Sequence, residues 1–124
     1  MTENGTPKLP YTEGSVWSLQ FIQVKPGATS KYLDHLRGTW TPLMEEAKRQ
    51  GVLTGYRILM GPPSGADDWN VLLVVEVPNM SSLDGYGQKI AAIEAGIRNG
   101  EHPTGTAELR GVLGAKLVRE ITLH

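Results

Sequence analysis

The sequence predicts an α+β domain in which one four-stranded antiparallel sheet carries its helices on a single face. Two observations lead to this fold class. The run Val71–Val77 is apolar at both alternating sets of positions, so both faces of this strand are expected to lie away from water. Strand-like and helix-like patterns also follow one another in the order strand, helix, strand, strand, helix, strand. Together they predict a small sheet whose second face meets another surface.

In the first half of the chain, alternating apolar residues predict a strand at residues 16–25, which a proline and a glycine end. A helical pattern then covers residues 29–50. Pro42 interrupts this pattern, because proline removes a helical hydrogen bond and clashes with the preceding turn. Either the helix kinks there, or a second helix begins with Thr41 as its cap and Pro42 in its first turn.

In the second half, residues 53–60 form the next predicted strand, and a turn-rich loop joins it to Val71–Val77 as an antiparallel hairpin. A helical segment begins near Asn79 or Ser81, a short helical turn is expected at residues 107–113, and the last strand covers residues 115–123. No linker divides the chain. We therefore predict a flexible N-terminal tail at residues 1–14 and a single domain at residues 15–124.

The order of these elements is that of the ferredoxin-like, or split βαβ, pattern. Right-handed crossovers then place both helices on one face of the sheet. The other face would carry Ile22, Val24, Leu72 and Val74 if the cleaner apolar sets face the helices. An exposed apolar patch of this kind marks an interface, and pairing of two such faces would give an isologous dimer with the form of a dimeric α/β barrel.

Composition limits the partners. The 124 residues carry a formal net charge of −1 with no basic block, which argues against nucleic acid. The absence of cysteine excludes disulfides, thiol catalysis and cysteine-bound metals. No apolar stretch approaches the roughly 20 residues of a membrane helix, so no membrane partner is expected. The N-terminal residues lack an apolar signal region, and cytoplasm is the default expectation for location.

Several local strings resemble those of the dimeric α/β-barrel superfamily. These strings are Lys25-Pro26-Gly27, the long first helix with Trp40 and Pro42, Asp67-Asp68-Trp69, the segment at residues 79–85 and the segment at residues 116–121. They are similar to an uncharacterised bacterial branch, related to antibiotic-biosynthesis-monooxygenase-like and stress-responsive barrels, over about residues 15–123. The resemblance implies a homodimer. Superfamily relatives also include haem-degrading enzymes and muconolactone isomerases, and we find no catalytic residue set of theirs in this sequence.

Glu76 and His35 are the candidate catalytic residues. Glu76 is the single charge in the apolar run, and buried acids are rare unless paired. Glu76 either makes an ion pair with Arg57 or Arg119 inside the barrel, or acts as a proton acceptor in a cavity where Gln20 orients the substrate. His35 could act as a general base or a haem ligand, and the alternative is a partly exposed helix histidine.

The remaining candidates, together with Gln20, Arg57 and Arg119, would line a ligand pocket. Trp40 and Tyr56 are expected between the sheet and the first helix, where aromatic residues pack core or cavity. Trp69, after two aspartates, is either an indole lid or a turn anchor. His102 and His124 are expected at the surface. The three histidines lack metal-ligand spacing, so the sequence indicates no metal site and no cofactor.

Two main functions stay open at this point. The first is a protein that binds or transforms a small apolar or aromatic molecule in a cavity between sheet and helices. Oxygenase or isomerase chemistry without a cofactor would be the enzymatic form that the resemblance implies. The second is a structural or stress-associated dimer whose barrel is filled by side chains. Haem binding through His35 is a third possibility.

Overall fold

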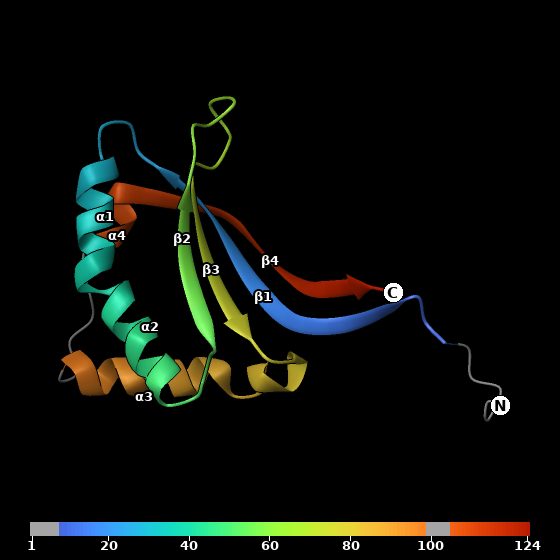
Figure 1. Ribbon diagram of the computed structural model, residues 1–124. Helices are drawn as coiled ribbons and strands as arrows, with labels where there is room; N and C mark the ends of the chain where they lie inside the picture. Colours follow the sequence, from blue (N-terminus) through green and yellow to red (C-terminus); the bar gives the residue numbers. More distant parts are fainter. Residues whose placement is uncertain (1–7, 99–104) are drawn as a thin grey trace.

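The computed structural model describes residues 8–98 and 105–124 of the chain (Figure 1). It has an α+β fold in which four antiparallel strands form one sheet in the order β2-β3-β1-β4. This arrangement is compatible with a ferredoxin-like fold. The strands are β1 (Tyr11–Val24), β2 (Gly55–Met60), β3 (Val71–Val77) and β4 (Arg110–Leu123). The helices are α1 (Thr29–Gly38), α2 (Trp40–Arg49), α3 (Tyr86–Arg98) and α4 (Thr106–Leu109), with a 3₁₀ turn, η2 (Met80–Leu83), before α3.

The register of β1 against β3 decides which side chains lie under the helices. Val16 stands opposite Val77, and Ile22 stands opposite Val71. All four are buried and pack against the apolar residues of α1, α2 and α3. Those helix residues are Tyr32, Leu36, Leu43, Met44, Ala47 and Ile93. The core therefore lies between the helices and one face of the two central strands.

The register corrects one part of the predicted open face. Leu72 and Val74 lie on the face away from the helices, as predicted, but Ile22 and Val24 lie beneath the helices. Both alternating sets of β1 are largely apolar, so the pattern alone could not choose between them. The set that contains Val16, Ile22 and Val24 packs under the helices, and the bulkier set turns to the open face. That set is Trp17, Leu19 and Phe21.

The helical segment around Pro42 is two helices, as the second alternative predicted. Thr39 leaves the helical region, with φ −122° and ψ −61°, between α1 and α2. The break therefore falls two residues before the predicted cap, Thr41. Pro42 occupies the first turn of α2, where backbone N–H groups have no helical partner and proline loses nothing.

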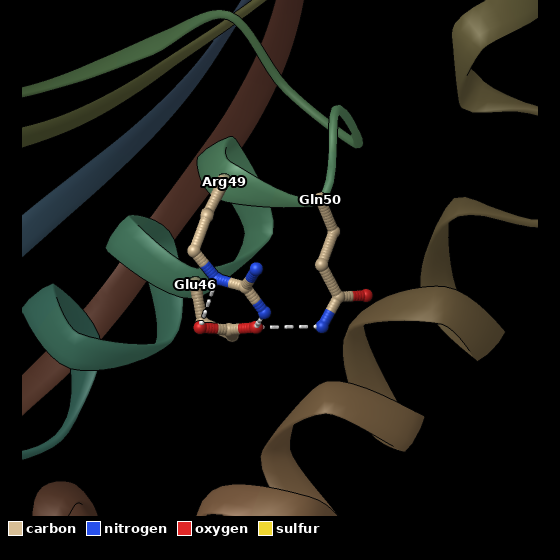
Figure 2. A network of polar contacts seen from close by, with 3 residues as sticks. All are labelled: Glu46, Arg49 and Gln50. Atoms are coloured by element: carbon tan, nitrogen blue, oxygen red, sulfur yellow. Dashed lines mark hydrogen bonds and ion pairs between the residues drawn. The ribbon is translucent and has the colours of Figure 1, made fainter.

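The end of α2 carries a compact polar network on the surface (Figure 2). The Glu46 carboxylate accepts hydrogen bonds from the Nε of Arg49 at 2.9 Å and from the Nε2 of Gln50 at 2.8 Å. These hydrogen bonds lower the pKa of Glu46 to about 2, and the hydrogen bond from Arg49 has the larger effect. The network fixes exposed side chains at the helix end and lies apart from the cavities described below.

The outer strands are longer than predicted. β1 begins at Tyr11, whose partner in β4 is Leu123, so residues 11–14 belong to the sheet and not to the predicted tail. β4 begins at Arg110, and the helical turn before it shrinks to α4. The sequence missed these extensions because the added residues are polar or glycine-rich and gain their order from cross-strand pairing. In Figure 1 the ends of β1 and β4 form a two-stranded arm that extends past the helices.

The segment before α3 follows the predicted start. The Asn79 side chain accepts a hydrogen bond from the backbone N–H of Ser82 at 3.1 Å and so caps η2. Gly85 then takes a left-handed conformation, with φ 68°, before α3 begins. Among residues 8–98 and 105–124, no helix is long and apolar enough to cross a membrane.

We expect Ile22→Ala to lower the free energy of unfolding by about 2–5 kcal/mol, because it empties a fully buried site under the helices. Met60→Ala is the control, since Met60 is 59% exposed, and it should cost less than about 1 kcal/mol. Urea denaturation measures both. Equal losses in the two variants would contradict the assignment of Ile22 to the helix-covered face.

Candidate functional site

A small cavity, the inner pocket, lies between the sheet and the helices. Its volume is about 170 Å³. β1 and β3 supply its floor, α1 and α2 one wall, and α3 and α4 the other side. The lining residues are Gln20, His35, Leu36, Thr39, Trp40, Leu43, Leu73, Glu94, Arg98, Thr106 and Arg110. An apolar wall with a few converging polar groups is the usual make-up of a small-molecule site.

The strongest feature of the inner pocket is an ion pair on α3. Arg98 Nη1 lies 3.6 Å from Glu94 Oε2, and only 11% of the Arg98 side chain is exposed. The Nη2 atom of Arg98 donates a hydrogen bond to the backbone carbonyl of Thr39 at 2.5 Å. Nη1 is buried, and within the described part of the chain no acceptor lies in hydrogen-bonding range of it. A buried donor without a hydrogen-bond partner costs about 1–3 kcal/mol of stability. Such donors are rare in native proteins, so this one calls for an explanation.

His35 faces the same pocket from α1. Its Nε2 atom and the Thr106 hydroxyl lie 2.6 Å apart and share a hydrogen bond. Thr39 Oγ1 donates to the His35 carbonyl at 2.7 Å, which ties the end of α1 to the helix break. The imidazole is therefore held in one orientation beside the cavity.

Arg110 closes the pocket at the start of β4. Its Nη1 donates to the Tyr32 hydroxyl at 2.7 Å, and its guanidinium lies 5.6 Å from the centre of the Tyr32 ring. Burial raises the pKa of Tyr32, and the charge of Arg110 opposes that rise. Tyr32 therefore stays a neutral phenol, and the Arg110 side chain lies between it and the pocket.

A larger hollow of about 610 Å³, the outer hollow, lies on the other side of Arg110. It is formed by the end of β1, the loop between β2 and β3, and the start of β4. Its lysine, Lys25, is exposed, and Asp68 is engaged by the Ser64 amide and hydroxyl at 2.8 and 3.0 Å. Those hydrogen bonds lower the pKa of Asp68. We take the inner pocket as the candidate site, because its charged groups are more buried and leave a donor unpaired.

Three of the predicted site residues meet in the inner pocket: Gln20 from β1, His35 from α1 and Trp40 from α2. Tyr56 lies behind Trp40, with the two rings edge to face at 5.5 Å between centroids. Its hydroxyl donates to the Glu45 carboxylate, and this hydrogen bond raises the pKa of Tyr56 to about 12. Tyr56 therefore supports the wall of the pocket and does not line it.

Glu76 does not join these residues. It stands opposite Trp17 in the sheet, whereas Gln20 stands opposite Leu73, so Glu76 and Gln20 point to opposite faces. Glu76 borders a groove of about 470 Å³ at the start of β2, which Trp17 and Arg57 also line. The prediction that Gln20 lies near Glu76 was wrong, because the alternation of side chains along β1 and β3 places them on opposite faces of the sheet.

The arginines proposed as partners of Glu76 lie elsewhere. Arg57 is placed over the Trp17 ring at 5.8 Å, and Arg119 lies 3.8 Å from Glu13. Within the described ranges, no lysine, arginine or histidine comes within 4.0 Å of the Glu76 carboxylate. The predicted ion pair inside a barrel is thus not formed in the single chain.

The remaining candidates lie at the surface. Trp69 packs against Phe21, with 5.8 Å between ring centroids, on the open face of the sheet. His124 Nε2 and the Thr12 hydroxyl lie 2.5 Å apart at the end of the strand arm. His102 lies outside the described residues. Across the described ranges, no three side chains of histidine, aspartate or glutamate gather in a way that could hold a metal ion.

Sequence reasoning missed Glu94, Arg98 and Arg110. A signal existed for the first two, because an acid and a base four residues apart lie on the same side of a helix. That spacing is common on solvent-exposed helices, and only the packing of α3 shows that this pair is largely buried. Arg110 gave no such signal, since it falls where the sequence predicts a helical turn.

Comparisons with known proteins gave no match to a protein family, a curated protein or a solved structure. The resemblance to the dimeric α/β-barrel superfamily therefore stays a prediction from local sequence strings and from the order of elements.

The Tyr56 phenol should titrate near pH 12. Glu45→Gln should bring its pKa down toward the ordinary value of about 10, because the charged acceptor that stabilises the protonated phenol is lost. NMR titration of ring-labelled tyrosine measures this, with Tyr56→Phe to assign the signal. An unchanged pKa in Glu45→Gln would show that Glu45 does not hold the hydroxyl.

Proposed function

We propose that this protein is a ferredoxin-like homodimer that binds a small, partly apolar molecule in the inner pocket of each chain. The observation that carries the proposal is the meeting of His35, Gln20 and the Glu94–Arg98 pair around a cavity walled by Trp40. Arg98 and Glu94 are largely removed from water, with 11% and 24% of their side chains exposed, and charges in such a place are costly unless they have a partner. A filled core needs none of them, which favours a ligand over a side-chain plug.

The ferredoxin-like part of the proposal is supported by the topology. β1 and β3 lie side by side at the centre of the sheet, with β2 and β4 at its edges. The connections from β1 to β2 and from β3 to β4 both run through helices on the same face. Right-handed crossovers give this arrangement in split βαβ domains.

An enzymatic form of the function would use His35. Its imidazole borders the pocket and is oriented by Thr106, so it can take a proton from, or return one to, a bound molecule. Gln20 offers both a donor and an acceptor from the floor of the pocket. Isomerase-like or cofactor-free oxygenase chemistry would need such a proton transfer. The alternative is a structural dimer without catalysis.

The open face of the sheet supports the dimer. This face carries an apolar set from all four strands, and no helix of the described chain covers it. Its members are Trp17, Leu19, Phe21, Leu59, Leu72, Val74 and Val118. A patch of this composition on a small domain is typical of an interface, and a two-fold axis lets the same patch serve both chains.

Ligand binding can be tested with a panel of small aromatic fragments, including phenol, indole and benzamide. We expect NMR shift changes at the side chains of His35 and Trp40, because both line the inner pocket. The signals of Lys25 and Asp68 serve as the control for the outer hollow. No shift at millimolar fragment concentration would remove the binding function and favour the structural dimer.

The dimer can be tested by Leu59→Asp, which places a charge on the open face at a side chain that is 48% exposed in the single chain. We expect light scattering at micromolar concentration to give twice the chain mass for the wild type and the mass of one chain for the variant. Burying an unpaired charge costs several kcal/mol. Met60→Asp is the matched control. The Met60 side chain is exposed on the opposite face of the sheet, so this variant should stay dimeric.

A further inference from the structure

We infer that the ligand of the inner pocket carries a carboxylate, and that Arg98 is the residue that binds it. This inference rests on the proposed function and names the class of molecule that the site takes. It starts from Arg98 Nη1, which is buried beside the cavity with no acceptor in the described part of the chain. Arg98 also lines that cavity, so a molecule that enters it lies against this residue.

The position of Arg98 is fixed before any ligand arrives. Its Nη2 atom is anchored on the Thr39 carbonyl at 2.5 Å, and Glu94 lies one helical turn away at 3.6 Å from Nη1. Glu94 balances part of the charge but lies beyond hydrogen-bonding distance of Nη1. The planar guanidinium is therefore oriented and still able to donate, which is the state that binds a carboxylate well.

The charge of the lining also favours an anion. Among the described residues that line the cavity, two are arginines, Arg98 and Arg110, and one is an acid, Glu94. His35 can add a further donor through its ring. In the low-dielectric space between sheet and helices, this excess of positive charge acts more strongly than it would at the surface.

The rest of the cavity selects the body of the ligand. Leu36, Leu43, Leu73 and Trp40 supply the apolar part of the lining. A volume of about 170 Å³ corresponds to the space of roughly five or six water molecules, at about 30 Å³ each. We therefore expect a small organic acid with one ring or a short chain, such as an aromatic monocarboxylate, and not a bare inorganic anion.

The test compares three probes on the full-length wild-type chain by calorimetry: benzoate, its neutral isostere benzamide, and inorganic phosphate. We expect benzoate to bind at least about 10-fold more tightly than benzamide, since a hydrogen bond to a charged group is worth that much. Phosphate should bind more weakly than benzoate, because it leaves the apolar wall uncovered. This comparison needs no variant and so does not depend on a mutant that folds.

Arg98→Gln should then reduce benzoate affinity by about 10-fold or more and leave benzamide within about 2-fold. Arg37→Gln is the control, because Arg37 on α1 is 80% exposed and away from the pocket. Thermal unfolding checks that both variants fold. Loss of benzoate binding in Arg98→Gln alone, with benzamide retained, supports a direct contact.

The possible failures are distinct. Equal binding of benzoate and benzamide would overturn the carboxylate and keep the pocket, and phosphate binding as tightly as benzoate would overturn the organic acid. Benzoate binding that Arg98→Gln leaves unchanged would show that Arg98 is not the residue that binds it. If none of the three probes binds, and the fragment panel gives no shifts, the proposed function itself fails.

Discussion

The pairing of β1 with β3 is the constraint on which the rest of the structure depends. Once Ile22 stands opposite Val71, every side chain of both strands is assigned to one face, because strand side chains alternate strictly. The helices then cover the face that carries Gln20, and Glu76 is left on the other. A shift of one residue in this register would exchange the two sets and place a carboxylate under the helices.

The inner pocket depends on a second feature, the break between α1 and α2. Thr39 leaves the helical conformation, and its carbonyl receives Arg98 from α3. Its hydroxyl meanwhile binds back to His35. One residue thus connects the two polar sides of the cavity to the same point of the backbone. Pro42 keeps the break in place, since a single straight helix through it would lose a hydrogen bond and clash.

Much of this fold was readable from the sequence, and the reasons differ by element. The bounds of β3 were predicted correctly because apolar residues occupy both of its faces, and the two-helix alternative followed from the chemistry of Pro42. The face of β1 was not readable, since both of its alternating sets are apolar. The site was predicted in part: His35, Gln20 and Trp40 meet, but Arg98 emerges only when α3 is packed. Long-range packing, which no local pattern encodes, supplied the missing residues.

The arm formed by β1 and β4 has a consequence for how the chain folds. β1 is a central strand, yet its second neighbour is β4, which follows the three other strands along the chain. Until residues 110–123 arrive, one edge of β1 stays unpaired, and an unpaired edge invites pairing with another chain. Closing a loop that spans nearly the whole sequence is also slow, because its entropy is lost before its contacts form. Completion of the sheet, and with it of the wall that holds Arg110, therefore depends on a contact between its first and last strands.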